Sequence, residues 1–207
     1  MVTARRRFVL ASASPARLRL LTEAGFAPEV IVSDVEEDAL LAGPLAGVTD
    51  VGALVSALAE AKAESVAGRP DAAGAVVVGC DSLLDVDGAA CGKPADEAEA
   101  AARLAKLAGR SAVLRTGHCV IDTASGRRSV AAAATEVHFG TYSDEELAAY
   151  LATGESLRVA GAFTLDGRFA PFVDGITGDH GTVVGLSPPL LRRLLADIGL
   201  TVMDLWA

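Results

Sequence analysis

A strand that runs directly into a helix at residues 8–24 is the feature of this sequence that most constrains its fold. Residues 8–11 form an apolar run that is typical of a buried strand. Ser14 suits the N-cap of the helix, Pro15 suits its first position, and Gly25 suits its C-terminal end. Strands and helices keep alternating along the rest of the chain, so the sequence predicts an α/β fold.

The same junction is suited to binding an anion. Ser12 and Ser14 supply hydroxyl groups, and Arg17 lies one turn into the helix. Free backbone amides, the positive end of the helix dipole and a guanidinium together favour a phosphate group. Taken by itself, the segment is equally compatible with an ordinary capped helix that carries a surface arginine.

The remaining elements are predicted from periodicity and turn signals. The run Ala-Val-Val-Val-Gly-Cys at 75–80 indicates a central strand covered on both faces, and Asp87-Gly88 predicts a hairpin rather than a calcium loop, which would need more ligands. No repeat or flexible linker interrupts the chain, so we expect one domain over residues 1–207. We expect further strands at 29–32, 83–86, 89–91, 112–121 and 129–139, and further helices at 50–67, 96–109, 143–154 and 187–195.

Composition excludes several classes of function. The formal net charge of −9 argues against broad nucleic-acid binding, which needs a basic face. No apolar stretch is long enough to span a membrane, and no signal peptide is evident, so we expect a cytoplasmic protein. The 3 cysteines lack a CxxC spacing and indicate buried thiols rather than disulfides or zinc ligands. The 3 histidines do not cluster, so nothing marks a histidine-based site.

Charged residues that suit phosphate chemistry occur at separate places along the chain. Asp81 ends the predicted central strand, where α/β sheets place ligands, and a carboxylate there is costly unless it is solvated, paired or bound to metal. Lys62 lies on a predicted helix, and Lys93 follows the hairpin. Together with Arg17, these groups could hydrolyse a phosphoanhydride with the help of a metal ion. The acidic loop at 34–38 is either solvated surface or part of that site.

An ordered series of short motifs resembles the Maf-like proteins, a family first called septum formation inhibitors and known as nucleoside triphosphate pyrophosphatases. The series begins with Leu-Ala-Ser-Ala-Ser-Pro-Ala-Arg at 10–17 and includes Gly-Cys-Asp-Ser at 79–82 and Gly-Lys-Pro at 92–94. The resemblance implies a mixed, elongated β-sheet flanked by helices, with a deep cleft, related to inosine triphosphate pyrophosphatases. It also implies a homodimer. The other matching segments are 32–37, 61–63, 108–111, 135–137, 160–163 and 183–186.

The resemblance also implies roles for individual residues. Asp81 matches the family's proposed proton acceptor, which activates water or holds the metal. Lys62 and Lys93 match lysines that meet the triphosphate, and Glu36 matches an acidic residue thought to help hold the divalent ion. The implied cofactor is Mg²⁺ or Mn²⁺.

The implied substrate-binding residues include two departures from the family pattern. Ser12, Ser14 and Arg17 match the phosphate-binding start. Ser82 stands where members that hydrolyse dTTP and UTP carry threonine, and it keeps the hydroxyl. Asp166 stands where those members carry glutamine, and an ionised carboxylate only accepts hydrogen bonds. We therefore expect a broader range of bases, including those with exocyclic amines.

The implied activity is metal-dependent hydrolysis of nucleoside 5′-triphosphates to nucleoside monophosphate and pyrophosphate. It would serve nucleotide-pool cleansing or the control of cell division. The alternative is a regulator of septum formation that binds nucleotide without turning it over. The enzyme needs Asp81, Lys93 and Glu36 together, whereas the regulator needs only the anion site.

Overall fold

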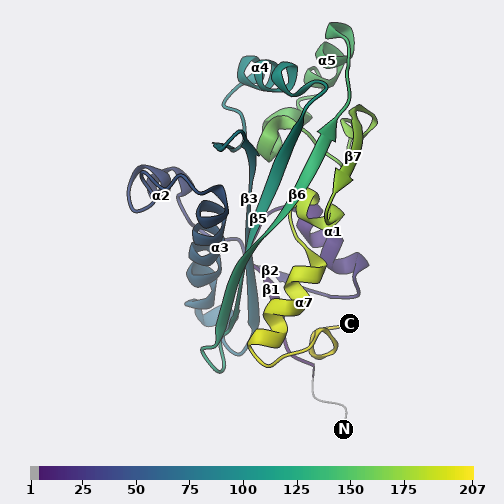
Figure 1. Cartoon of the computed structure of the whole chain (residues 1–207). Helices are drawn as coiled ribbons and strands as arrows, with labels where there is room; N and C mark the ends of the chain where they lie inside the picture. Colours follow the sequence, from purple (N-terminus) through teal and green to yellow (C-terminus); the bar gives the residue numbers. More distant parts are fainter. Residues whose placement is uncertain (1–4) are drawn as a thin grey trace.

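A mixed seven-stranded sheet forms the centre of the computed structural model, which describes residues 5–207 (Figure 1). The main strand order is β2-β1-β3-β5-β6-β7, and β4 pairs with β3. Strand β1 is parallel to both of its neighbours, while the remaining pairs are antiparallel, which confirms the predicted mixed sheet. The strands are β1 (Phe8–Leu10), β2 (Glu29–Val30), β3 (Val76–Val86), β4 (Ala89–Cys91), β5 (Ser111–Asp122), β6 (Arg128–Phe139) and β7 (Val173–Thr177).

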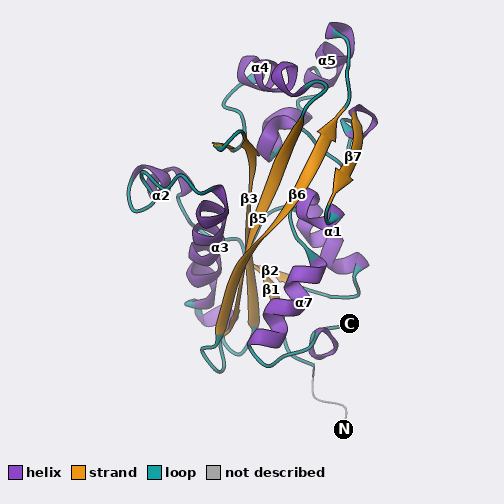
Figure 2. Cartoon of the chain, in the orientation of Figure 1, coloured by secondary structure: helices purple, strands orange, loops and turns teal. Residues whose placement is uncertain are grey.

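Helices cover both faces of the sheet, as predicted. In Figure 2, α3 lies on one side of the long strands, α7 lies on the other, and α4 and α5 lie at the upper end. Alternate residues of β3 enter separate cores, because Val76 and Val78 pack with α1 and α7 while Val77 packs with α3. The helices are α1 (Pro15–Glu23), α2 (Glu37–Ala42), α3 (Val51–Ala67), α4 (Glu97–Leu107), α5 (Asp144–Leu151), α6 (His180–Val184) and α7 (Pro188–Asp197).

The predicted helix boundaries follow from side-chain caps. Ser14 accepts a hydrogen bond from the Arg17 amide, and Pro15 takes the first position of α1. Asp50 and Ser187 cap α3 and α7 in the same way. Residues 159–185, which are glycine-rich, form short helices and the short strand β7, and α2 begins inside the acidic loop predicted at 34–38.

Strand β3 is continuous through the position where two separate strands were predicted. Asp81 therefore lies inside a strand, and the expectation that it ends one was wrong. Along one edge, β3 pairs with β1 as far as Val78 and with β4 only from Leu84. Between those positions no described strand pairs with that edge, so the chain leaves an opening beside Asp81.

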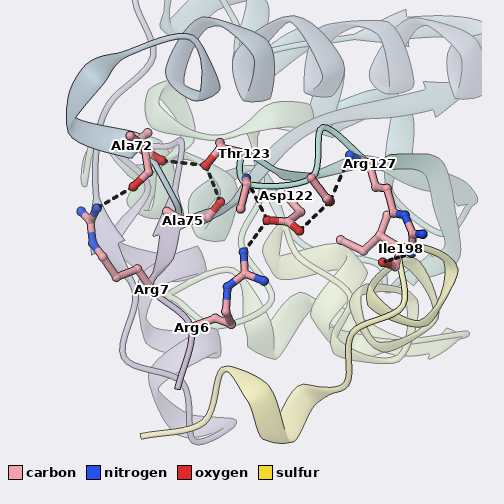
Figure 3. Close-up of polar contacts among 11 residues, drawn as sticks. Arg6, Arg7, Ala72, Ala75, Asp122, Thr123, Arg127 and Ile198 are labelled. Atoms are coloured by element: carbon pink, nitrogen blue, oxygen red, sulfur yellow. Dashed lines mark hydrogen bonds and ion pairs between the residues drawn. The ribbon is translucent and has the colours of Figure 1, made fainter. Parts of the chain in front are cut away.

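Contacts at the far end of the long strands fix where β3 begins. The Thr123 hydroxyl, which follows β5, donates to the carbonyl oxygens of Ala72 and Ala75 (Figure 3). Arg6 forms an ion pair with Asp122 beside it. These contacts tie the turn after β5 to the segment that enters β3, so the register of the central strands is set outside the cleft.

Three further predictions concern the state of the cysteines, membrane-spanning helices and the number of domains. All 3 cysteines are free thiols. Cys80 and Cys119 are buried, as predicted, and burial raises the pKa of Cys80 to about 11 and that of Cys119 to about 12. Cys91 is only half-buried, so the prediction of a buried thiol was wrong for this residue. Within residues 5–207, no helix is long and apolar enough to cross a membrane. The single domain over 1–207 stays a prediction, and residues 1–4 lie outside the described part.

Candidate active site

A cleft of about 500 Å³ opens beside the unpaired edge of β3. Its walls come from segments far apart in the sequence, which the sheet brings together. One wall is the turn from β1 into α1, and the opposite wall is the segment of short helices and loops after α5. The volume lies in the range of cofactor and substrate sites. The predicted cleft is therefore present, and it holds the motifs that the sequence singled out.

Two carboxylates share one lysine at the bottom of the cleft. Lys62 Nζ lies 2.5 Å from Asp81 Oδ1 and 2.6 Å from Glu37 Oε1. Lys62 is only 8% exposed and Asp81 only 5% exposed. Buried charges of this kind persist only when they are paired, and here each partner neutralises the other. The lysine thus holds both carboxylates at one place.

Two glycines allow α3 to bring Lys62 this close to the sheet. Gly117 lies opposite Asp81 in the register of β3 and β5, and Gly79 lies two residues earlier on the same face. A Cβ atom at Gly117 would lie 2.0 Å from the Val55 carbonyl oxygen, and one at Gly79 would lie 2.4 Å from that of Ala59. The backbone of α3 therefore rests directly on the sheet.

Burial changes the acidity of Asp81. Loss of solvent raises the pKa of its carboxyl above the usual value, and the charges of Lys62 and Arg17 oppose this shift. A carboxylate with a raised pKa holds a proton more tightly than one in water. Asp81 is consequently a stronger base than an exposed aspartate.

Arg17 joins the parts of the cleft. Its Nε donates to the Gly185 carbonyl at 2.7 Å, Nη1 donates to Ser12 Oγ at 3.0 Å, and Nη2 donates to Ser82 Oγ at 3.1 Å. These partners come from the β1–α1 turn, β3 and the end of α6. The guanidinium is therefore fixed in place before any ligand arrives.

The directions of the hydrogen bonds separate the two serines. Thr116 Oγ1 donates to the Thr182 carbonyl, so in its 2.9 Å contact with Ser82 the serine is the donor. The Ser82 proton is thus used inside the protein. Ser12 accepts from Arg17 and from the Ser14 amide, and no described group accepts its proton. Ser12 can therefore donate to a ligand. We call Ser12, Arg17, Lys62, Asp81 and Ser82 the floor of the cleft.

The rim of the cleft, which we define as Lys93, Arg158 and Asp166, is more open. Lys93 follows β4, and Arg158 ends the short helix η2 (Glu155–Arg158). Their segments are joined where the Gly161 amide donates to the Gly92 carbonyl at 3.1 Å. Among residues 5–207, Lys93 and Arg158 have no hydrogen-bond or ion-pair partner. Both cations are free to meet an anion.

Asp166 is the acidic member of the rim, and it is not free. Its carboxylate forms an ion pair with Arg19, which extends from α1 on the opposite wall. The Asp166 side chain is 24% exposed and that of Arg19 is 49% exposed. This pair connects the two walls of the cleft, and the sequence analysis did not identify Arg19.

Comparison with known proteins identifies the family. The profile of a family described as Maf-like protein matches residues 7–198. The chain belongs to the Maf-like family.

Close relatives match over nearly their whole length. A nucleoside triphosphate pyrophosphatase of Streptomyces coelicolor is 62% identical over 203 residues, which cover 98% of this chain and 96% of the relative. One of Streptomyces avermitilis is 58% identical over 202 residues, covering 98% and 95%. One of Salinispora tropica is 52% identical over 204 residues, covering 97% and 88%. The similarity to these relatives covers at least 97% of the chain.

Most of the residues predicted for the Maf-like site meet in this cleft, with one exception. Glu36 takes the N-cap position of α2, is exposed, and does not line the cleft. Its neighbour Glu37 lines the cleft and pairs with Lys62. The residues that do line it are Ser12, Ser14, Arg17, Lys62, Asp81, Ser82, Lys93 and Asp166.

The Maf-like family implies a divalent ion, and the carboxylates of the cleft can be compared with the ligands that such an ion needs. Within residues 5–207, no group of three or more His, Cys, Asp or Glu side chains forms a metal cage. Asp81 and Glu37 nevertheless present two oxygen donors at one place. Mg²⁺ is commonly bound by one or two carboxylates together with substrate phosphates rather than by a protein cage. The side chains therefore fit an ion that arrives with a nucleotide.

Proposed function

We propose that this chain hydrolyses nucleoside 5′-triphosphates to nucleoside monophosphate and pyrophosphate. The observation that carries the proposal is the buried Asp81 carboxylate, which lies 2.5 Å from Lys62 in a cleft with an anion-binding turn. The names of the relatives from Streptomyces and Salinispora support it. Nucleotide-pool cleansing or the control of cell division is the proposed role in the cell.

Asp81 acts as the general base in this reaction. Water attacks the α-phosphorus while its proton passes to an Asp81 oxygen. The bond from that phosphorus to the bridging oxygen breaks, and pyrophosphate leaves with the electron pair. The raised pKa of Asp81 favours proton uptake, because burial has already removed the water that would compete for the carboxylate.

Cations of the cleft neutralise the triphosphate. Lys62 offsets one of the two negative charges of the carboxylates that face it, so that an anionic substrate meets less repulsion. Arg17 holds Ser12 in position, and the Ser12 hydroxyl then donates to a phosphate oxygen. Lys93 approaches from the rim, with its charge unpaired among the described residues. Lys62 and Arg17 act from fixed places, which lowers the cost of reorganisation during the reaction.

A divalent ion, Mg²⁺ or Mn²⁺, would be held by Asp81 and Glu37. Bound there, it would polarise a phosphoryl oxygen and offset the developing negative charge. Glu37 takes this role in place of Glu36, because only Glu37 lines the cleft.

Product analysis tests the proposed reaction. We expect nucleoside monophosphate and pyrophosphate from a panel of triphosphates in the presence of Mg²⁺ or Mn²⁺, with pyrophosphate and orthophosphate measured separately. Nucleoside diphosphate and orthophosphate as the main products would contradict the proposed bond. Tight nucleotide binding with no turnover under any metal would instead support the septum-formation regulator.

Two further proposals rest on the family alone. We propose that the protein is a homodimer, which light scattering coupled to size-exclusion chromatography tests directly. We also propose that Asp166 broadens base choice beyond uracil and thymine. A strict preference for UTP and dTTP, unchanged in Asp166→Gln, would contradict the second proposal.

A further inference from the structure

The segment that brings Glu37 to the cleft has little apolar packing of its own. No residue between positions 27 and 50 is buried, and Leu40 and Leu45 are partly buried against a core that includes the start of α3. The Ile31 amide donates to the Leu10 carbonyl at 3.2 Å. Within residues 5–207, no later backbone-to-backbone hydrogen bond joins residues 32–48 to the rest of the chain. Polar side-chain contacts therefore largely decide where Glu37 lies.

Two side chains of α3, one turn apart, contact this segment. Lys62 Nζ lies 2.6 Å from Glu37 Oε1 at the cleft. Ser65 Oγ donates to the Asp34 carboxylate, three residues before Glu37. This hydrogen bond lowers the pKa of Asp34, so the carboxylate is ionised at neutral pH. Residues three apart on a helix share a face, and both contacts therefore hold the segment against the same side of α3.

A weaker contact follows the C-terminal end of α3. Arg69 Nη1 donates to the Val32 carbonyl at 3.4 Å, which is longer than a typical hydrogen bond. The partners in the segment fall in number as those along the helix rise, so the segment runs antiparallel to α3. The contact between Ser65 and Asp34 is the middle one, and it lies closer to Glu37 than the weak contact of Arg69 does.

We propose that Ser65 and Asp34 are positioning residues that keep Glu37 beside Asp81, an inference that rests on the proposed function. Neither of the two lines the cleft. Without their contact, Glu37 would be away from Lys62 for a larger fraction of the time. The apparent affinity for a divalent ion with nucleotide would fall in proportion to the fraction that stays in place. The chemical step would be unchanged in the saturated protein, because binding returns Glu37 to the cleft.

Proteolysis tests whether the contact holds the segment. When a segment opens and closes quickly, its cleavage rate follows the population of the open form. Cleavage by a glutamate-specific protease after Glu36 or Glu37 should become about two- to fivefold faster in Ser65→Ala and in Asp34→Ala, the size expected for one exposed hydrogen bond. The double variant should be cleaved no faster than either single variant, since both changes remove the same contact. Mass spectrometry identifies the cleaved bond.

Binding and kinetics together test whether the contact matters for the site. In Ser65→Ala, the Kd of Mn²⁺ measured by calorimetry with the α,β-methylene analogue of UTP should rise about two- to fivefold. The kcat at saturating Mn²⁺ should stay close to the native value. Ser65→Thr keeps a hydroxyl group and should restore both the native Kd and the native cleavage rate.

A second serine of α3 supplies the matched control. Ser56 Oγ donates to the Gly52 carbonyl at 2.8 Å, inside the helix itself. Ser56→Ala thus removes a hydroxyl group from the same helix without touching the segment that carries Glu37. The cleavage rate after Glu36 or Glu37 and the Kd of Mn²⁺ should both stay at their native values.

The variants decide this inference, and the native protein decides the proposed function. Unchanged cleavage in both Ser65→Ala and Asp34→Ala overturns the inference, and so does faster cleavage with an unchanged Kd of Mn²⁺. A fall of kcat at saturating Mn²⁺ with an unchanged Kd also overturns it. A native protein that binds the analogue with Mn²⁺ but hydrolyses no triphosphate overturns the proposed function alone. Failure of the native protein to bind the analogue overturns both proposals.

Discussion

In the floor of the cleft every charged side chain is held by a neighbour, whereas on the rim Lys93 and Arg158 have no partner among residues 5–207. The floor is built on the β1–α1 turn, α1, β3 and α3, and its lysine and aspartate are almost fully buried. The rim comes from a hairpin end and a series of short helices. We infer from this difference that the floor and the rim have different roles. A fixed floor suits one chemical step, and an open rim suits substrates that differ in their bases.

The largest expected effect lies in the floor, at Asp81. Asp81→Asn keeps the shape of the side chain and removes the base, so kcat should fall about 10²–10⁴-fold. Nucleotide binding should survive, because a negative charge facing the triphosphate is also removed. Pyrophosphate release gives kcat, and calorimetry gives Kd. Near-normal turnover in this variant would remove Asp81 from the mechanism.

A second prediction separates two adjacent glutamates. Glu37→Gln removes a charged partner of Lys62, and kcat/KM should fall roughly 10–100-fold, with more metal needed for half-maximal rate. Glu36→Gln is the matched control, because Glu36 is exposed outside the cleft. Metal titrations of both variants make the comparison. A larger loss in Glu36→Gln would restore the assignment made from the family resemblance.

The rim should respond more weakly than the floor. Lys93→Ala removes a charge that meets the triphosphate on binding and meets a larger developing charge in the transition state, so Kd and kcat should each worsen by about tenfold. Lys93→Arg should recover most of the loss, since an unpaired and exposed site tolerates a longer cation. Steady-state kinetics and calorimetry measure both quantities. A fall of kcat as large as that expected for Asp81→Asn, with unchanged Kd, would mean that Lys93 acts in the chemical step like the floor residues.

The smallest expected effect is a dependence of folding stability on pH, caused by a histidine buried beneath the floor. It does not change the rate at neutral pH. His118 is buried beside β3, and its Nε2 accepts the Ser187 amide at 2.8 Å. Burial lowers the pKa of His118 to about 4 from 6.5. The unfolded chain then binds the proton first, so stability falls as the pH drops from 6.5 towards 4. The loss between pH 7 and pH 5 should be about 2 kcal/mol.

Urea unfolding at the two pH values measures that loss. In His118→Gln the pH-dependent part should shrink, while other titrating groups contribute equally in both proteins. The prediction fails if the native protein and the variant lose the same stability over this interval.

Sequence predicted the floor better than the rim, and the reasons are local. Ser14 and Pro15 mark the start of α1, and Gly25 marks its end, by caps and turn chemistry that act within a few residues. The length of β3 was not predictable in this way, because its continuation past Asp81 depends on pairing with β5 and β4. The rim pair Arg19–Asp166 joins residues far apart in the chain, and no local pattern marks it.

The choice between Glu36 and Glu37 shows a second limit. Both lie in one acidic run, and neither periodicity nor composition says which of them faces inward. The start of α2 decides it, because Glu36 becomes the N-cap and Glu37 the first helical residue. A shift of the start of α2 by one residue would thus change which carboxylate contacts Lys62.

The glycines under α3 have a consequence for anyone who reads function from mutational scans. Gly79 and Gly117 carry no reactive group, yet even a methyl group at either position would push against the helix backbone. Displacing the helix would draw Lys62 away from Asp81, and activity would fall without any loss of chemistry. In a variant library scored by turnover, substitutions at Gly79 and Gly117 would therefore look as damaging as substitutions of the reacting groups. Only a structural readout on the same variants would tell them apart.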